Sequence, residues 1–389
     1  MKLPVMLYVQ HLLGVGHLHR TVRIAHALRE LDLEVTLVSG GLPVPGLNTD
    51  GLTFVQLPSV RAADESFSAL LKENGSPVDE PWRAMRREAL LAAFQRIRPR
   101  VLVTEMFPFG RRQMRFELLP LLEAVRAAQP RPWLVSSVRD ILVQARDPER
   151  YREMAELAED HFDRVLVHGD PGLIHFARTF PLAERIAGKL YHTGYVVGEA
   201  PPPPGARGGE KEVLVSTGSR EGGRHLLEAA LAARPLTALS GRPWRILASL
   251  QLPMEQLRRY EQQAPAGVTV ERFRPDFTAL LRHAELCISQ GGYNTTMEVL
   301  RAGVRPVLAP YTGGRDSEQA LRAQLLSERG AVVMLPWEEL GPARLAEAVD
   351  EAFARPPAGR LRVDMNGAAA SAALIREMAR FPSPPGSAN

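Results

Sequence analysis

The sequence predicts an α/β protein made of two doubly wound, Rossmann-like domains that face each other across a cleft. Short β-rich apolar runs alternate with helical patterns along the chain, which is typical of parallel strands joined by helical crossovers. A Pro- and Gly-rich tract at 198–212 interrupts this alternation, which then starts again. With 389 residues, 45% of them hydrophobic, the chain is also too long for one compact domain.

The first domain is expected to span residues 1–198. Its strands are predicted from the runs VMLYVQ, EVTLVS, TFVQL, RVLVTE, WLVSSV and RVLVH, with helices near 17–31, 81–98 and 149–160. Each strand should be followed by a crossover, so all the strands should be parallel.

The second domain is expected at 213–360, after a linker at 199–212. Its strands are predicted from EVLVSTG, RILASL, VTVERF, ELCISQ and RPVLAPY, with helices from 223, at 254–263 and at 294–302. A further helix over 361–380 is a candidate to pack back on the first domain, and 381–389 should be a disordered tail. Ligands bind beyond the carboxyl ends of parallel strands, so the functional site is expected between the domains.

Composition excludes several classes of protein. Lys and Arg exceed Asp and Glu by 48 to 44, a net charge of +4 that argues against nucleic acid as a partner. The single cysteine, Cys287, excludes an intramolecular disulfide and multi-cysteine metal sites, and it fits a reducing compartment. No apolar run is long enough to span a bilayer, and the first residues read as a buried strand rather than a signal peptide. We expect a cytoplasmic protein; peripheral contact with the inner membrane face and the oligomeric state stay open.

The first glycine loop, HLLGVGHLHR, places Gly14 and Gly16 between a strand and a helix and His17 in the first helical turn. It is not a dinucleotide-binding loop, because His19 stands in place of the third glycine and no carboxylate ends the second strand. No P-loop motif occurs either. A helix N-terminus keeps imidazole neutral, so His17 is a candidate general base. Capping or packing is the alternative, and His11 and His19 are rival bases.

The loop STGSREGGRH follows the first strand of the second domain. It places Gly218, Ser219 and Gly222 where backbone N–H groups and a hydroxyl could meet a diphosphate. A turn of this composition is common, so the loop gains weight only from the motifs that follow.

A second loop, SQGGYNTTMEVL, has Gly291 and Gly292 at a strand end and Thr295 in the first turn of a helix. Glu298 lies just inside that helix, where its carboxylate could bind ribose hydroxyls or merely favour the helix dipole. In the next junction, Glu318 and Gln319 suit sugar hydroxyls, although alone they would pass as a solvated helix start.

Together these motifs resemble GT-B glycosyltransferases of the MurG-like group, related to the peptidoglycan UDP-N-acetylglucosamine transferase. The likeness is densest over 213–333 and extends to GVGHLHR, EMFPFGRRQMRFELLPLL, SSVRDIL and HTGYV, so it covers nearly the whole chain. It looks closest to a group of predicted bacterial glycosyltransferases.

The resemblance implies that the second domain holds a UDP-sugar and the first domain the acceptor. By position, it implies diphosphate contacts at Gly218, Ser219 and Gly222, uracil recognition by the backbone at Phe273 and Arg274, a glycine-rich helix start at Gly292 and Thr295, ribose binding by Glu298, and reading of the donor sugar by Glu318 and Gln319.

Some positions depart from the family pattern. In the first loop only Gly16 and His17 match the glycine-rich family motif well. The stretch TGYVVGE lacks the arginine that relatives supply to the diphosphate, and Glu318 stands where they carry an amide. The identity of the donor sugar therefore stays open.

Two motifs of the first domain allow more than one interpretation. Arg139 and Asp140, at a strand end, form either an internal ion pair or part of the acceptor site, and Asp140 is a catalytic candidate beside His17. The stretch 107–122 interleaves aromatic residues with arginines, as an acceptor-site or membrane-surface helix would, but ordinary helix packing is favoured.

These interpretations predict a glycosyltransferase that moves a hexose or N-acetylhexosamine from a UDP-sugar to a hydroxyl acceptor, either a small molecule or a lipid-linked one. Inversion is expected, with no metal and no cofactor besides the UDP-sugar co-substrate. One alternative is a nucleotide-sugar hydrolase or epimerase, and another is a non-catalytic nucleotide-sugar-binding protein.

Overall fold

The computed structural model describes residues 2–64, 69–145, 147–198, 211–218, 222–250, 252–274, 276–312, 318–356 and 362–383. The chain forms two compact units, the first made of Met1–Val196 with Val363–Asn389 and the second of Val197–Arg362. The chain therefore passes from one unit to the other twice. Within the described residues, no helix is both long and apolar enough to cross a membrane.

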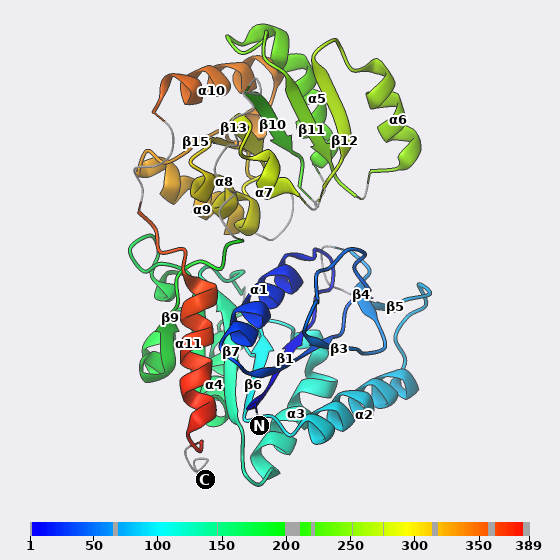
Figure 1. Cartoon of the computed structure of the whole chain (residues 1–389), viewed down its shortest axis with the longest axis vertical. Coiled ribbons are helices and arrows are strands. Elements are labelled where there is room, and N and C mark those ends of the chain that lie inside the picture. Colours follow the sequence, from blue (N-terminus) through cyan, green and yellow to red (C-terminus); the bar gives the residue numbers. More distant parts are fainter. Residues whose placement is uncertain are drawn as a thin grey trace. The chain divides into compact units, whose positions relative to one another are not determined.

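Unit 1 contains a seven-stranded sheet in the order β3-β2-β1-β6-β7-β8-β9, in which every neighbouring pair is parallel (Figure 1). Its strands are β1 (Pro4–Val9), β2 (Glu34–Ser39), β3 (Thr53–Gln56), β6 (Val101–Glu105), β7 (Trp133–Arg139), β8 (Arg164–His168) and β9 (Leu190–His192). A separate antiparallel hairpin joins β4 (Val60–Ala62) to β5 (Leu70–Lys72). The strand order reverses between β1 and β6, which makes their carboxyl ends the topological switch point of this sheet.

Helices cover both faces of the sheet in unit 1. They are α1 (Gly16–Glu30), α2 (Glu80–Ile97), α3 (Arg115–Ala127), α4 (Pro148–His161) and α11 (Gly367–Arg380). Alternate residues of β1 enter different cores, because Val5 and Leu7 pack in the cluster that includes α1 and α11, whereas Met6 and Tyr8 pack in the one that includes α2 and α3. Burial on both faces is why these strands read as continuous apolar runs.

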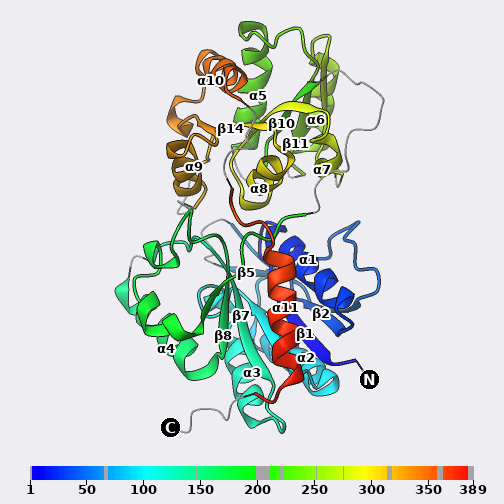
Figure 2. The same ribbon diagram turned by 60° about the vertical axis from the view of Figure 1, so that its left-hand side comes forward.

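The helix expected over 361–380 begins at Gly367 and lies beside α1, as Figures 1 and 2 show. Ala372 and Ile375 share a core cluster with Leu18 and Val22 of α1. The tail expected from 381 begins in contact with unit 1, because the carbonyl of Phe381 accepts a hydrogen bond from Trp133 at 3.1 Å. Its remainder from 384 lies outside the described residues.

The aromatic and arginine-rich stretch 107–122 packs as an ordinary part of the fold. Phe107, Phe109 and Met114 are buried, and α3 begins only at Arg115, after a short 3₁₀ helix over Arg112–Met114. The packing interpretation of this stretch therefore fits the structure.

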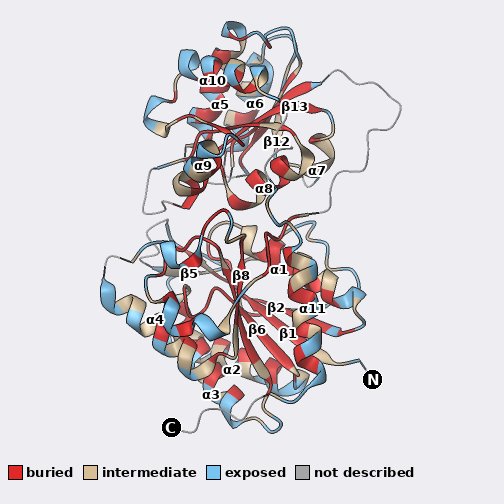
Figure 3. Ribbon diagram, turned by 90° about the vertical axis from the view of Figure 1, so that its left-hand side faces the viewer, coloured by how far each residue is buried: buried red, intermediate tan, exposed pale blue. Residues whose placement is uncertain are grey.

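Unit 2 contains a six-stranded parallel sheet in the order β12-β11-β10-β13-β14-β15. Its strands are β10 (Glu212–Ser216), β11 (Trp244–Ala248), β12 (Val268–Arg272), β13 (Ala284–Ser289), β14 (Arg305–Leu308) and β15 (Val333–Met334). Its helices are α5 (Gly223–Ala233), α6 (Met254–Gln263), α7 (Phe277–Leu280), α8 (Tyr293–Ala302), α9 (Glu318–Glu328) and α10 (Pro342–Ala354). In both units the central strands are buried and the helices expose one side, as Figure 3 shows, whereas the edge strands β3 and β9 are partly or largely exposed. The order reverses between β10 and β13, so their carboxyl ends are the switch point of this sheet.

Of the linker expected at 199–212, residues 199–210 lie outside the described residues, and Glu212 is already the first residue of β10. Two α/β units with parallel sheets match the predicted fold class.

Candidate functional site

The switch point of unit 1 carries the first glycine loop. Gly14 lies in the segment between β1 and α1, and Gly16 is the first residue of α1. His17 follows in the first helical turn, and Glu105 ends β6 directly beside it. A histidine and a carboxylate thus meet where a doubly wound sheet binds its ligands.

His17 and Glu105 form a hydrogen-bonded pair, with Nδ1 of His17 2.6 Å from Oε1 of Glu105. An ionised carboxylate only accepts, so Nδ1 carries the proton and Nε2 is left as the basic nitrogen. The side chain of His17 is 18% exposed and that of Glu105 only 1%. The histidine can therefore reach a ligand while the carboxylate stays behind it.

The charges around this pair keep the imidazole neutral. Burial, together with the positive charge of Arg111, outweighs Glu105 and lowers the pKa of His17 to about 3. Arg20 also donates to Oε1 of Glu105, and Nη2 of Arg111 lies 3.7 Å from Oε2. Burial opposes ionisation of Glu105, but His17, Arg20 and Arg111 hold the pKa of its carboxyl well below the usual range. The site is thus a neutral base backed by an ionised carboxylate.

Glu105 was missed by sequence reasoning, although it lies in the run RVLVTE that correctly predicts β6. The signal in the sequence was a carboxylate at the end of an apolar run, and only the structure shows that this run lies next to β1. The following loop begins at Met106 and reaches Arg111, and both have left-handed backbone, with φ of 67° and 61°. Such conformations are uncommon outside glycine and gather at functional sites.

The rival histidines have other surroundings. His11 is buried, and its Nε2 lies 3.0 Å from the carbonyl of Leu42. Burial lowers the pKa of His19, with Arg23 adding to the effect. Within the part of the chain that the structure describes, pairing with a carboxylate distinguishes His17 from both.

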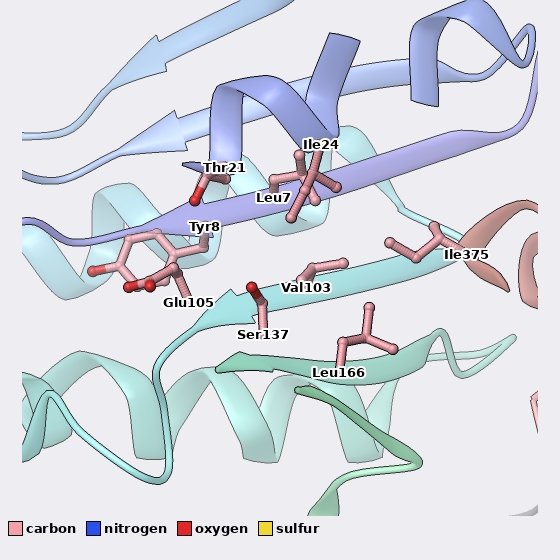
Figure 4. Close-up of a pocket in the computed structure, with 9 residues that line it drawn as sticks. All are labelled: Leu7, Tyr8, Thr21, Ile24, Val103, Glu105, Ser137, Leu166 and Ile375. Atoms are coloured by element: carbon pink, nitrogen blue, oxygen red, sulfur yellow. The ribbon is translucent and has the colours of Figure 1, made fainter. Parts of the chain in front are cut away.

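A small cavity that Glu105 helps to line lies between the sheet of unit 1 and the helices α1 and α11 (Figure 4). Leu7, Ile24 and Ile375 are among the apolar side chains that line it, and Glu105 and Ser137 are among the polar ones. Because it lies between the sheet and the helices α1 and α11, we read it as a gap in the core rather than a substrate pocket.

Asp140 lies in the interior of unit 1 and not at an accessible surface. It is fully buried just beyond β7, and its Oδ2 accepts a hydrogen bond from the hydroxyl of Tyr195 at 2.8 Å. Arg139, the last residue of β7, is partly exposed. Its charge is felt at His17, where it lowers the pKa of the imidazole.

In unit 2, the two glycine loops lie against each other. A Cβ on Gly218 would lie 2.5 Å from the side-chain oxygen of Gln290, the residue before Gly291. Gly218 and Gly291 both have left-handed backbone, with φ of 72° and 74°. Loops this close can contact one ligand, and helices α5 and α8 begin directly after them.

Gly222 caps α5 with φ of 84°, and a Cβ there would lie 2.6 Å from Trp337 and 2.8 Å from Tyr311. Only glycine fits under this aromatic pair, whose rings meet edge to face. Ser219 lies outside the described residues.

The start of α8 combines amide donors with a carboxylate. Gly292 is the N-cap of this helix, and Thr295 is partly exposed in its first turn. Glu298 lies in the next turn, and its exposed fraction is 8%. The hydroxyl of Thr296 is buried with no hydrogen-bond partner among the described residues. These groups can meet a phosphate and a sugar hydroxyl together.

Phe273 and Arg274 follow β12. The N–H of Phe273 donates to the carbonyl of Ala248 at 2.9 Å, so this N–H group is not available to a ligand. The side chain of Phe273 is 40% exposed. The guanidinium of Arg274 is held by both carboxylate oxygens of Asp276. Base recognition by this segment would thus use backbone groups other than the N–H of Phe273.

Glu318 and Gln319 open α9, and both are buried. Oε1 of Glu318 accepts from Arg322 at 2.8 Å, and Arg322 lies over the ring of Tyr293. The side-chain oxygen of Gln319 is buried without a hydrogen-bond partner among the described residues. Such an acceptor suits a ligand hydroxyl.

Comparison with known proteins finds a family match over part of the chain. Residues 213–377 match the glycosyltransferase family 28 C-terminal domain. Over 77 residues the chain is 39% identical to a UDP-N-acetylglucosamine–N-acetylmuramyl-(pentapeptide) pyrophosphoryl-undecaprenol N-acetylglucosamine transferase of Ralstonia nicotianae, which is 20% of this chain and only 21% of that protein.

Solved structures match over nearly the whole chain. MurG of Acinetobacter baumannii has a TM-score of 0.57 at 16% identity, covering 97% of this chain and 100% of its own. The calicheamicin glycosyltransferase CalG4 has a TM-score of 0.59 at 19% identity, covering 98% and 94%. The fold is therefore that of GT-B glycosyltransferases, as the sequence predicts.

Proposed function

Since the chain has a GT-B fold and its residues 213–377 match a family 28 glycosyltransferase domain, we propose that it is a glycosyltransferase. It transfers a hexose or N-acetylhexosamine from a UDP-sugar to a hydroxyl acceptor, with inversion. Unit 2 binds the donor and unit 1 the acceptor. The observation that carries the proposal is the pair of adjacent glycine loops of unit 2, each leading into a helix N-terminus.

The chemical step uses the neutral imidazole of unit 1. The acceptor oxygen attacks the anomeric carbon, its proton passes to Nε2 of His17, and the bond from that carbon to the diphosphate breaks to release UDP. Glu105, which accepts from Nδ1, stabilises the imidazolium as it forms. The buried arginine Arg20 holds that carboxylate in place.

The leaving diphosphate gains negative charge as the bond breaks. Backbone N–H groups at the Gly218 and Gly292 loops and the N-terminal ends of α5 and α8 stabilise that charge. We propose that these dipoles replace a metal ion. Turnover should therefore persist in EDTA, and loss of activity that only Mg²⁺ restores would refute this part of the proposal.

The first experiment is a thermal-shift and calorimetric panel of UDP-, GDP- and dTDP-sugars. A ligand that binds the folded state raises its apparent stability, and we expect UDP-sugars to do so most. Product analysis then follows with the donor alone. Rapid sugar release without acceptor would favour a hydrolase, and binding without any turnover would favour a non-catalytic sensor.

A further inference from the structure

Two sequence motifs of unit 1 meet in the structure without contributing to the proposed chemistry. SSVRDIL contains the end of β7, and HTGYV contains the segment 192–196 that leads to the first crossing into unit 2. Asp140 belongs to the first motif, and Tyr195 to the second. Both side chains are fully buried, and the tyrosine hydroxyl donates to Oδ2 of Asp140 at 2.8 Å.

A second bridge joins the same motifs through β8. Ser137 Oγ lies 2.7 Å from Nε2 of His168, and Nδ1 of His168 lies 2.9 Å from Oγ1 of Thr193. All three residues are at most 3% exposed. Burial lowers the pKa of His168 to about 3, so its ring is neutral and has one donor and one acceptor nitrogen for these two hydroxyls.

The segment that returns the chain to unit 1, from Val363 on, is hydrogen-bonded to the segment of the first crossing. The N–H of Tyr195 donates to the carbonyl of Asp364 at 2.7 Å, and the N–H of Gly367 donates to the carbonyl of Tyr195 at 3.0 Å. A Cβ on Gly367 would lie 2.3 Å from the carbonyl oxygen of Gly194, so the two segments can approach this closely only because glycine is present.

The first crossing is also held on its unit 2 side. Nη1 of Arg301, on α8, donates to the carbonyl of Gly198 at 2.7 Å. Between this bond and the Asp140 to Tyr195 bond there are only two residues, Val196 and Val197. Helix α8 begins at the proposed diphosphate loop, and β7 ends near His17.

From these contacts we infer that Asp140 is a positioning residue rather than a catalytic one: through Tyr195 it fixes both interdomain crossings to the strand ends of unit 1. This inference rests on the proposed function, because transfer requires both units to act on one donor and acceptor pair. Loosening the anchor should slow transfer without weakening donor binding, since the donor groups all lie in unit 2.

The test compares Tyr195→Phe, Asp140→Asn and the double variant with the wild-type chain. Tyr191→Phe is the matched control, because Tyr191 is 45% exposed on β9 in the same stretch of chain. Hydrogen exchange is followed at the amides of Tyr195 and Gly367, with Leu7 in β1 as a reference for global unfolding.

We expect exchange at Tyr195 and Gly367 to rise roughly tenfold in Tyr195→Phe, as loss of a hydrogen bond to a charged group predicts, with Leu7 unchanged. Asp140→Asn should have no larger effect, and the double variant no further one. The kcat for UDP formation from the UDP-sugar should fall by about the same factor while the Kd for UDP stays within about twofold.

Three results would overturn the inference: unchanged exchange in Tyr195→Phe, a change that Tyr191→Phe reproduces, or a kcat for Asp140→Asn more than about tenfold below that of Tyr195→Phe. The last result would mean that Asp140 touches the reacting groups. Failure of wild-type protein to bind UDP would refute the proposed donor site alone, because the exchange measurement does not depend on it.

Discussion

At the scale of single residues, the proposed chemistry depends on a hydrogen bond between residues 88 positions apart, His17 and Glu105. The sequence predicts the histidine, because a glycine loop followed by a helix start is a local pattern. It does not predict the carboxylate, because adjacency of β1 and β6 arises only when the sheet forms. The same reason hides the Asp140 to Tyr195 bond.

Removing either member of the pair should slow the chemical step. We expect His17→Ala to lower kcat by about 10²- to 10⁴-fold, the usual contribution of a general base, and Glu105→Gln to lower it in the same direction by less. Steady-state kinetics with calorimetric UDP binding checks this, since the Kd for UDP should not change. Glu123→Gln, exposed on α3, is the control. Wild-type turnover by His17→Ala would remove the base assignment.

The acid side of the pH profile offers an independent check. His17 must be neutral to accept a proton, and burial holds its pKa at about 3. Turnover should therefore show no loss assignable to His17 as the pH falls from 8 to about 5. An inflection near 6.5 that disappears in His17→Gln would show that the histidine titrates normally, contrary to this expectation.

The ribose contact that the family resemblance implies for Glu298 can be tested by Glu298→Gln. The amide keeps the size of the side chain but weakens a charge-assisted hydrogen bond, so the Kd for UDP should rise by about tenfold. Isothermal titration calorimetry measures it, with Glu328→Gln on the exposed side of α9 as control. Equal affinities for the two variants would place the ribose elsewhere.

At the scale of elements, alternating apolar runs and helical patterns predict the fold class because parallel strands are buried on both faces. The strands predicted for unit 2 and its helices from 223, at 254–263 and at 294–302 appear where the pattern places them, whereas β15 and α10 were not predicted. The glycines of its loops are visible because left-handed turns require them. The side chains that surround these glycines are not predictable from local sequence. Trp337 reaches Gly222 from more than a hundred positions away.

Two glycines with left-handed backbone, Gly222 and Gly303, differ in the space around them, so replacing each by alanine distinguishes backbone strain from steric crowding. Gly222→Ala would place a methyl group against Trp337 and Tyr311, whereas Gly303→Ala, at the end of α8, would meet open space. Both should lose about 1 kcal/mol from backbone strain, but only Gly222→Ala should displace the loop and weaken UDP binding by at least about tenfold. Chemical denaturation and calorimetry measure the two effects. Undiminished affinity in Gly222→Ala would separate this loop from the diphosphate.

At the scale of the whole molecule, two compact units are joined by two connecting segments. The contacts of these segments are the part of the structure that is hardest to predict from the sequence. The Pro- and Gly-rich tract marks the break between the domains, but the return of the chain to unit 1 as α11 depends on apolar residues that match the surface of α1. Complementarity between segments 350 positions apart is a tertiary property. The sequence therefore shows that a further helix exists, whereas only the structure shows the bonds that hold both crossings.

Acid should destabilise unit 1 through the buried histidine at this junction. Burial lowers the pKa of His168 to about 3 in the folded chain, against an ordinary value of 6.5. Below pH 6.5 the histidine binds a proton in the unfolded chain but not in the folded chain. Its contribution to the free energy of unfolding is therefore fully present above pH 6.5 and is lost as the pH falls towards 3, by up to about 5 kcal/mol. Urea unfolding at a series of pH values, followed through hydrogen exchange at the amide of Leu7 in unit 1, measures this loss.

The comparison that isolates the histidine uses His168→Gln, which can still hydrogen-bond to Ser137 and Thr193 but does not titrate. It should be less stable than the wild-type chain at pH 8, because its fit is imperfect, yet should lose less stability between pH 7 and pH 4. His175→Gln, at an exposed position of the same unit, should retain the wild-type slope. If His168→Gln also retains it, the acid sensitivity of unit 1 arises from other groups, with His17 the next to examine because burial lowers its pKa as well.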